Sequence, residues 1–330
     1  MDYVVEIIIK DPTEYVITSE LFNRYEKNPI LTPAEWPYRI NAVFNAGAVR
    51  IEDETLLLVR VEDMRGFSHL TIARSKDGKT NWKIDDHPAL VPQPDVYPEE
   101  LWGLEDPRIM YLEERGEYVV TYTAYSCNGP RVSLATTEDF QHFNKLGNIM
   151  LSADKNASLF PHKFNGRWAL IHRPMPIYHA PRGHIWISYS IDLKHLGDHK
   201  LIMKTRDGVW WDSNRIGIGP PPIETDEGWL IIYHGVKKTP SGRLYRLGLA
   251  LLELENPENV LHRSDEWVFG PRMSYERIGD VPNVTFSCGA VADKRKNELS
   301  LYYGAADTTI CLAIGKIDKI LEYVLSCPKG

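Results

Sequence analysis

The chain has 330 residues, of which 43% are hydrophobic and 25% are charged, the balance of a folded globular protein. Its 9 Trp, 17 Tyr and 9 Phe supply ample core material, so the composition excludes intrinsic disorder. The net charge of −7 and the lack of a basic run argue against binding to nucleic acid or to an anionic membrane, so a local cluster of cations must hold any anion.

The N-terminal segment 1–15 carries acids where a signal peptide needs a basic region, and no apolar run reaches the roughly 20 residues that cross a membrane. The four cysteines are scattered without a CxxC pair, which predicts reduced thiols in a cytoplasmic protein. His195 and His199 are four residues apart, but we expect them to lie on a surface turn and not to bind a metal. We therefore expect neither a metal nor an organic cofactor.

Segments rich in β-branched and aromatic residues, bounded by Gly, Asn, Asp and Pro clusters, predict strands along most of the chain. In chain order the clearest are 55–62, 117–125, 167–173, 184–191, 229–236 and 298–305. The tail 317–326 has apolar residues at three- and four-residue spacing, which predicts a C-terminal helix. The fold class is therefore expected to be all-β with one short helix at the end.

Five segments share one plan, in which a strand rich in small residues or proline leads through a polar turn into an apolar strand. They are 45–60, 105–125, 159–174, 219–235 and 287–307. Their starts lie roughly 55–70 residues apart, which suits a four-stranded propeller blade and is too long for a β-helix. A pair of β-sandwiches would not explain five copies of the same segment. The sequence therefore predicts a five-bladed β-propeller over 27–330, preceded by an extension, 1–26, that serves assembly.

A second motif recurs between these segments, at 73–82, 134–143 and 188–196. Each copy has a strand, then small residues, then an Asp, then an aromatic or apolar residue. Asp side chains favour tight turns because they accept hydrogen bonds from the following backbone amides. The motif predicts the turn between the outer strands of a blade.

The innermost strands of a propeller line a central channel, and ligands bind at its mouth. Functional residues should therefore have the same phase, that is, occupy equivalent positions in different repeats. The apolar strands end in Arg60, Tyr125, His172-Arg173, His234 and Asp307, and the opening strands add Asn45, Glu105, Asp106, Lys155 and Arg215. A lone Arg or His at a strand end is usually a solvated surface residue, but closure of the ring would bring these side chains into one funnel.

Cations and acids fall in different sectors of this funnel. Lys155, Arg173, Arg215 and His234 come from the third and fourth repeats, a sector that suits phosphate. Asn45, Arg60 and Asp307 suit sugar hydroxyls, and Trp102, Tyr125 and Tyr303 are candidates to stack on pyranose rings. Asp106 precedes Pro107, which predicts an extended backbone and a fixed carboxylate there.

Several motifs stand in a specific order: Lys27-Asn28-Pro29-Ile30-Leu31, the region of Asn45, Glu105-Asp106-Pro107-Arg108, Leu159-Phe160-Pro161, His172-Arg173-Pro174, 216–222, Tyr233-His234-Gly235 and 302–307. Together they resemble glycoside hydrolase family 130, the inverting β-mannoside phosphorylases. The resemblance begins at Lys27 and extends over nearly all of the remaining chain. The Glu-Asp-Pro-Arg form is similar to the branch of mannooligosaccharide and mannobiose phosphorylases.

The resemblance implies that inorganic phosphate attacks the anomeric carbon of a β-mannoside and that α-mannose 1-phosphate leaves with inverted configuration. It implies that Asp106 is the catalytic acid, acting through the mannose 3-hydroxyl. Phosphate would be held by Lys155, Arg173, Arg215 and His234, and the mannosyl unit by Asn45, Arg60 and Asp307. Beside these, we expect Glu105, Tyr125 and Tyr303 to contact the substrate. Two positions depart from the family: Arg215 replaces a more frequent Lys, and His162 a more frequent acid.

Two other functions stay open on the sequence. An inverting hydrolase would need a second carboxylate as base, for which Glu105, Glu224 and Asp307 are candidates. A propeller of this kind could also bind glycans without catalysis. For a phosphorylase we expect β-1,4-mannooligosaccharides as substrates, with β-1,2-mannosides as the alternative. The loops at the rim of the funnel, 63–69, 92–103, 176–184 and 237–246, should decide between the two linkages. The expected partners are mannoside and phosphate, and a homo-oligomer is left open.

Overall fold

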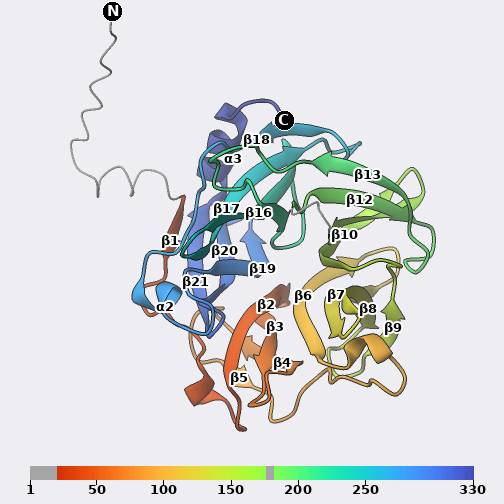
Figure 1. Cartoon of the computed structure of the whole chain (residues 1–330), viewed down its shortest axis with the longest axis vertical. Helices are drawn as coiled ribbons and strands as arrows, with labels where there is room; N and C mark the ends of the chain where they lie inside the picture. Colours follow the sequence, from red (N-terminus) through yellow and green to blue (C-terminus); the bar gives the residue numbers. More distant parts are fainter. Residues whose placement is uncertain (1–20, 176–181) are drawn as a thin grey trace, which may run out of the picture.

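The computed structural model describes residues 21–175 and 182–330, which form antiparallel sheets around a central axis (Figure 1). The sheets make five blades, so the predicted five-bladed propeller is confirmed. One parallel bridge, between Ser68 and Gly103, joins the first two blades at their edge.

Each blade runs from an inner strand at the channel to an outer strand at the periphery. Blade 1 contains β2 (Ala42–Ile51), β3 (Glu54–Glu62), β4 (Ser68–Ser75) and β5 (Lys83–Ile84), and blade 2 contains β6 (Gly103–Leu112), β7 (Glu117–Ser126), β8 (Gly129–Thr137) and β9 (Asn144–Asn148). Blade 3 contains β10 (Asp154–Phe164), β11 (Arg167–Pro174), β12 (Ile185–Ser190) and β13 (Gly197–Met203). Blade 4 contains β14 (Arg215–Ile218), β15 (Ile223–Thr225), β16 (Gly228–Thr239), β17 (Gly242–Leu252) and β18 (Val260–Arg263).

Blade 5 contains β19 (Thr285–Asp293), β20 (Glu298–Ala305) and β21 (Thr309–Lys316), and its outer strand is β1 (Phe22–Arg24). Phe22 pairs with Gly315 and is buried in the core of this blade. The first and last parts of the described chain therefore meet in one sheet. This corrects the expected boundary at residue 27, because residues 22–24 belong to the propeller. Residues 1–20 of the expected extension lie outside the described residues.

The repeated Asp turns are found where the sequence predicts them. Asp77 Oδ1 accepts hydrogen bonds from the backbone amides of Lys79 and Thr80, each over 2.8 Å, in the connection between β4 and β5. Asp139 and Asp192 accept amides in the same way between the outer strands of blades 2 and 3. His195 belongs to one of these turns, where its Nδ1 lies 2.7 Å from Asp192 Oδ2.

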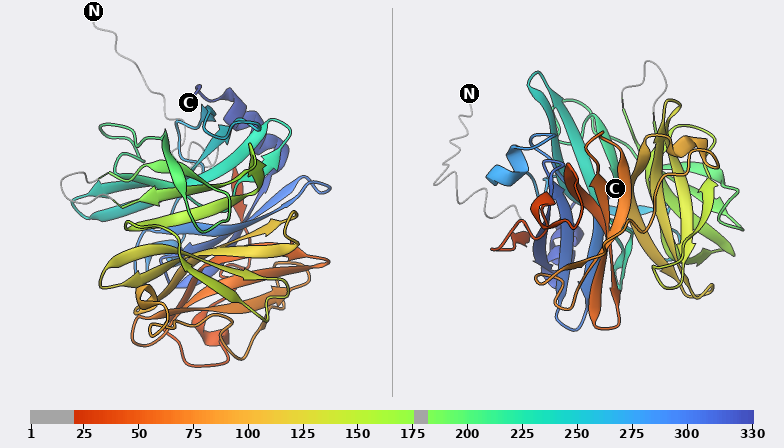
Figure 2. Two further views of the ribbon diagram at one scale, coloured as in Figure 1. Left: turned by 90° about the vertical axis from the view of Figure 1, so that its right-hand side faces the viewer. Right: turned by 90° about the horizontal axis from the view of Figure 1, so that it is seen from below.

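Apolar side chains fill the space between neighbouring blades. Strand side chains alternate between the two faces of a sheet, so each blade contributes to two such layers. The predicted C-terminal helix is present as α3 (Ile317–Ser326), and its Ile320 and Val324 pack against blade 5 and β17 of blade 4. The helix lies at the periphery of the ring (Figure 2). The other helices of the described residues are short: η1 (Pro33–Glu35), η2 (Pro98–Glu100) and α2 (Ser274–Arg277).

All four cysteines are free: Cys288 and Cys311 are buried, Cys327 is partly buried and Cys127 is exposed. Within residues 21–175 and 182–330, no helix has the length and apolar character needed to cross a membrane.

Candidate functional site

A cavity of about 410 Å³ opens at one mouth of the channel, and all five blades contribute to its wall. The wall includes every predicted site residue except Trp102 and Tyr303: Asn45, Arg60, Glu105, Asp106, Tyr125, Lys155, Arg173, Arg215, His234 and Asp307. Residues that are far apart in the sequence are therefore gathered at one funnel, as the shared phase of the repeats predicts.

Three inner strands present a polar side chain to this cavity through the same device. The strand register shifts between Phe44 and Gly47, between Glu105 and Arg108, and between Lys155 and Ser158. In each bulge one residue has a positive φ: Asn45 at 49°, Asp106 at 52° and Asn156 at 55°. Asn and Asp tolerate this left-handed conformation better than other residues with a side chain. The expected extended backbone at Asp106 is therefore wrong, because the bulge outweighs the preference set by Pro107.

Asp106 is held by two neighbours on one oxygen. Its Oδ1 accepts hydrogen bonds from Asn45 Nδ2 over 2.9 Å and from Arg60 Nη1 over 3.0 Å. Arg60 also donates to Glu105 Oε1 over 3.1 Å, which makes one guanidinium bridge two carboxylates. Among the described residues, no hydrogen bond occupies Oδ2 of Asp106, and this oxygen remains for a ligand.

Two carboxyls near Arg60, those of Asp106 and Asp307, differ in pKa. Burial alone would raise the pKa of Asp106, but the positive charges of Arg60 and Lys155 outweigh it and hold the pKa at about 2. Burial raises the pKa of Asp307 to about 7, and the nearby charges of Asp106 and Glu105 outweigh part of the attraction of Arg60. Asp106 is therefore ionised at neutral pH, whereas Asp307 is close to half-protonated there.

Arg108 lies beneath Asp106 and is 2% exposed. Its guanidinium donates to three backbone carbonyls, those of Asp106, Ile218 and Gly219, at 2.6–3.0 Å. These bonds tie the bulge of β6 to the end of β14 across the channel. Since the bonds go to neutral carbonyls, the positive charge of Arg108 adds to the field in the cavity.

The cation half of the cavity is rich in unused hydrogen-bond donors. The Nε atoms of Arg173 and Arg215 and the Nδ1 atom of His234 are buried and have no hydrogen-bond partner among the described residues. Burial and the charge of Arg215 lower the pKa of Arg173 to about 10, so it is still a cation at neutral pH. Buried donors of this kind normally have partners, so the cluster indicates a site for an anion.

His234 is neutral at neutral pH, although the sequence suggested a further cation. Burial lowers the pKa of His234 well below its usual range, and the charge of Arg173 lowers it further. Arg173 Nη1 lies 3.5 Å from His234 Nε2, and because a guanidinium only donates, Nε2 is the acceptor. The ring proton is therefore assigned to Nδ1, which makes this unpaired atom a donor.

Two glycines leave space for side chains that line the cavity. A Cβ atom on Gly217 would lie 2.6 Å from Cε1 of His234 and 3.1 Å from Oδ1 of Asn156. A Cβ atom on Gly304 would lie 2.2 Å from Oδ1 of Asn45. These positions explain why small residues recur in the strands that surround the channel.

Tyr303 is not in the cavity, so its predicted contact with the sugar is wrong. The residue is fully buried, its hydroxyl donates to Glu276 over 2.8 Å, and its ring meets Phe269 edge-on at 5.0 Å. The cause is the face of β20 that it occupies: Tyr303 packs with Leu301 and Ala305 of the same strand in an apolar cluster that includes residues of blade 4. Tyr125 does line the cavity, and Trp102 lies outside it, 38% exposed, with its ring 5.5 Å from that of Tyr125.

Sequence reasoning missed eight residues of the wall: Pro130, Asn156, Met175, Arg243, Tyr245, Val281, Val284 and Phe286. Asn156 could have been found, because it occupies the same bulge position as Asn45 and Asp106. Tyr245 stacks on His234 at 6.3 Å through strand pairing that no local signal reveals. His162, where the family more often has an acid, lies outside this wall and packs against Phe164 and Trp229.

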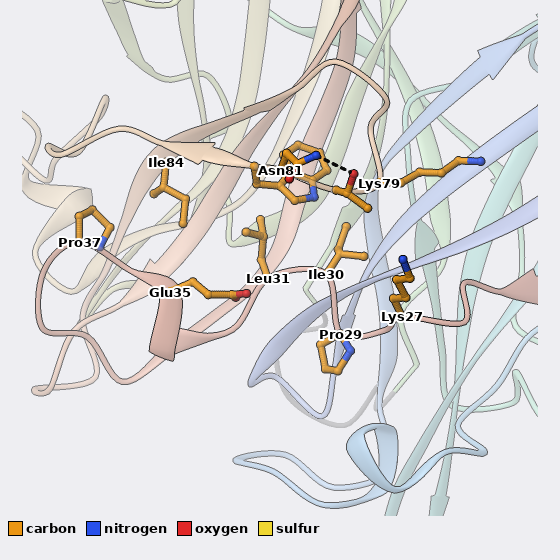
Figure 3. A pocket seen from close by; sticks show the side chains of 11 residues that line it. Lys27, Pro29, Ile30, Leu31, Glu35, Pro37, Lys79, Asn81 and Ile84 are labelled. Atoms are coloured by element: carbon orange, nitrogen blue, oxygen red, sulfur yellow. Dashed lines mark hydrogen bonds between the residues drawn. The ribbon is translucent and has the colours of Figure 1, made fainter.

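Another cavity, of about 460 Å³, lies at the outer side of blade 1 (Figure 3). Its wall joins segment 27–37 to the connection between β4 and β5, with Ile30, Leu31 and Ile84 as apolar members. Lys27, Lys79 and Glu35 supply its charges. None of the predicted site residues lines it, and we assign it no role. Across the described parts of the chain, no group of three or more His, Cys, Asp or Glu side chains could hold a metal ion.

Comparison with known proteins agrees with this geometry. The profile of glycoside hydrolase family 130, described as beta-1,4-mannooligosaccharide phosphorylase, matches residues 17–326. The beta-1,4-mannooligosaccharide phosphorylase of Ruminococcus albus is 36% identical over 309 residues, covering 92% of this chain and 90% of that protein. The 1,2-beta-oligomannan phosphorylase of a Thermoanaerobacter species is 38% identical over 303 residues, covering 88% of this chain and 96% of that protein.

A solved structure shows the same similarity in three dimensions. The beta-1,2-mannobiose phosphorylase of Listeria innocua, in complex with beta-1,2-mannobiose, aligns with a TM-score of 0.82 at 31% identity. The alignment covers 92% of this chain and 99% of that one.

Proposed function

This chain belongs to glycoside hydrolase family 130, and we propose that it is an inverting phosphorylase that cleaves β-1,4-mannooligosaccharides with inorganic phosphate. The products would be α-mannose 1-phosphate and a shortened sugar. The observation that carries the proposal is the division of the cavity into two halves: the three carboxylates of the described wall gather around Arg60, and buried, unpaired donors gather around Arg173 and His234.

Phosphate is already a nucleophile, so a phosphorylase needs cations to place it rather than a base to activate it. Lys155, Arg173 and Arg215 would supply charge, and His234 would donate its Nδ1–H to a phosphate oxygen. Each charge-assisted bond is worth roughly 1.5–3 kcal/mol, so a few of them can hold phosphate in a protein of net charge −7.

The acid must carry a proton when the glycosidic bond breaks, and Asp106, with a pKa of about 2, has lost its proton at neutral pH. A phosphate anion bound beside Lys155 and Arg173 would offset the positive field that keeps the carboxyl ionised, and its binding would raise the pKa of Asp106. The proton would then pass, through the mannose 3-hydroxyl, to the glycosidic oxygen as the bond from carbon 1 to that oxygen breaks. A phosphate oxygen forms the new bond to carbon 1 from the opposite face.

A hydrolase of the same fold is less well supported. It would need a carboxylate base across the cavity from Asp106, with space for water between them. The other two carboxylates of the described wall, Glu105 and Asp307, lie in the same half as Asp106, around Arg60. Glu224 lies outside this cavity, in the short strand β15.

The β-1,4 linkage rests on the description of the family profile and on the Ruminococcus albus relative. Other relatives act on β-1,2-linked mannosides, so this linkage is the second candidate. Of the rim loops expected to govern the choice, residues 176–181 lie outside the described residues. The absence of a cofactor, a cytoplasmic location and assembly into a homo-oligomer stay predictions.

The test is incubation with β-1,4-mannobiose and β-1,4-mannotriose, and in parallel with β-1,2-mannobiose, each with and without phosphate. Phosphate-dependent release of mannose 1-phosphate is the expected result. Release of free mannose without phosphate would indicate a hydrolase, and binding without turnover would indicate a glycan-binding propeller.

A further inference from the structure

Four polar side chains form a row across the whole of blade 3, from its inner strand to its outer strand. His172 Nδ1 donates to Asp154 Oδ2 over 2.6 Å, since a carboxylate only accepts. Ser188 Oγ lies 2.7 Å from His172 Nε2 and 2.6 Å from His199 Nδ1. Asp154, His172 and Ser188 are at most 2% exposed, whereas His199 is at the surface.

This row lies on the face of the blade opposite to the phosphate half of the cavity. Lys155 pairs directly with Arg173 across β10 and β11, and Asp154 pairs with Pro174. Because side chains alternate along a strand, Asp154 and His172 share one face while Lys155 and Arg173 share the other. The two proposed phosphate ligands are thus flanked, in both strands, by members of the buried row.

Asp154 also fastens the backbone of a phosphate ligand. Its second oxygen, Oδ1, accepts a hydrogen bond from the backbone amide of Arg173 over 3.1 Å. The strand register shifts just beyond Lys155, so the regular ladder between β10 and β11 is interrupted where the two cations leave the sheet. The carboxylate of Asp154 supplies a fixed point at that interruption, and His172 fixes the carboxylate.

We infer that Asp154 and His172 are positioning residues for phosphate: they hold the ends of β10 and β11 so that Lys155 and Arg173 converge on one anion. The inference rests on the proposed function, because it concerns the same site. Neither side chain lines the cavity, so both act through the backbone that they hold. In metal sites, removal of a group that orients a metal ligand lowers the affinity or the activity about 10- to 100-fold. We expect an effect of similar size for a group that orients a phosphate ligand.

The test compares variants that differ in whether the Arg173 amide keeps its acceptor. Asp154→Ala removes it, whereas the amide oxygen of Asp154→Asn can replace it. We expect Asp154→Ala to raise the phosphate KM about tenfold or more, with the mannoside KM changed less than about threefold, and Asp154→Asn to restore most of the difference. Phosphate-induced shifts in Tm, measured without sugar, should weaken in the same order.

A control removes buried volume from the same blade without touching the row. Ile187→Val deletes one methyl group from the core of β12 and should lower Tm while leaving the phosphate KM unchanged. His172→Asn tests the second member, because an Asn amide can still donate to Asp154; a smaller change than in His172→Ala is expected.

The outcomes separate the two proposals. If the wild-type protein shows neither phosphate-dependent turnover nor a phosphate-induced Tm shift, the proposed function fails. If the wild type does respond to phosphate but soluble, folded Asp154→Ala has an unchanged phosphate KM, or both KM values rise equally, the positioning role is overturned. If Asp154→Ala does not fold, the same comparison is made between His172→Ala and His172→Asn, and equal phosphate KM values in those two variants overturn it.

Discussion

Asn45 donates a 2.9 Å hydrogen bond to Oδ1 of Asp106, and the two residues occupy the same bulge in neighbouring blades. One blade thus fixes the carboxylate that the next blade supplies. Since Arg60 donates to the same oxygen, Oδ1, the second oxygen, Oδ2, is the one that can bind a substrate. The repeated bulge is therefore the reason why the two carboxylate oxygens of Asp106 differ, with Oδ1 hydrogen-bonded to Asn45 and Arg60 and Oδ2 left for a ligand.

Asp106→Asn should abolish most phosphorolysis and keep the fold. An amide cannot give up a proton as a carboxylic acid does, and general acid catalysis contributes about 10²–10⁴-fold to rate. Release of mannose 1-phosphate measures the loss, and circular dichroism measures the fold. Glu224→Gln is the matched control, because it makes the same chemical change outside the cavity. Turnover at the wild-type rate in Asp106→Asn would exclude this residue as the acid.

Arg173→Ala should raise the KM for phosphate much more than the KM for mannoside. The loss of about 1.4 kcal/mol of binding free energy corresponds to a tenfold change, and a buried charge-assisted bond is worth at least that much. Initial rates over a matrix of phosphate and mannoside concentrations separate the two constants. Arg167→Ala, on the same strand but paired with Asp198 at the surface, serves as control. Equal increases in both constants would remove Arg173 from the phosphate site.

The repeat made most of the site predictable, because position within a repeat fixes position around the ring. Phase alone groups Arg60, Arg173 and His234 at one mouth of the channel. The aromatic character of a residue does not show which face of its strand it occupies, which is why Tyr303 was misplaced. The protonation of His234 depends on burial beside Arg173, a property of the closed ring and not of any segment.

Pairing between distant segments was equally invisible to local patterns. Strand β1 is only three residues long, and its partner β21 lies at the other end of the chain. Hydrophobic periodicity cannot identify a strand of that length. The same holds for the contact of Tyr245 with His234, which arises only when β16 and β17 are in register.

Gly217→Ala should weaken phosphate binding although it adds only a methyl group. The new Cβ would lie 2.6 Å from Cε1 of His234, closer than carbon atoms can approach, so the imidazole or the strand must move. We expect the phosphate KM to rise about tenfold, as for loss of one bond to a charged group. Gly197→Ala is the control, because its Cβ would meet nothing within 4 Å. An unchanged phosphate KM in Gly217→Ala would show that His234 does not contact phosphate.

Tyr303→Phe should lower stability and leave the kinetics unchanged. The hydroxyl donates to the buried carboxylate of Glu276, and hydrogen bonds to charged groups contribute about 1.5–3 kcal/mol. Urea unfolding measures the loss. By contrast, Tyr125→Ala should raise the mannoside KM, because this ring lines the cavity. A raised mannoside KM in Tyr303→Phe, without a similar loss of stability, would restore Tyr303 to the sugar site.

Asp307→Asn should stabilise the protein at alkaline pH more than at acidic pH. The pKa of Asp307 is raised from 3.8 to about 7 in the fold, so between these values the unfolded chain has lost a proton that the folded chain retains. Stability attributable to this group therefore falls as pH rises from 4 to 7, and the full penalty applies above 7. At 1.36 kcal/mol per pKa unit the upper bound is roughly 4 kcal/mol, and the realised penalty is smaller because solvent reaches part of the side chain.

An Asn at position 307 does not ionise, so the variant escapes this penalty. The difference in Tm between Asp307→Asn and wild type, measured without ligand, should be small near pH 4, grow through pH 5–7 and level off above pH 8. Asp318→Asn provides the opposite control, because hydrogen bonding to Asn297 lowers the pKa of this exposed carboxyl and no gain at high pH is expected. A Tm difference for Asp307→Asn that does not vary with pH would show that Asp307 ionises in its ordinary range, and the assignment of a protonated carboxyl beside the ionised Asp106 would be withdrawn.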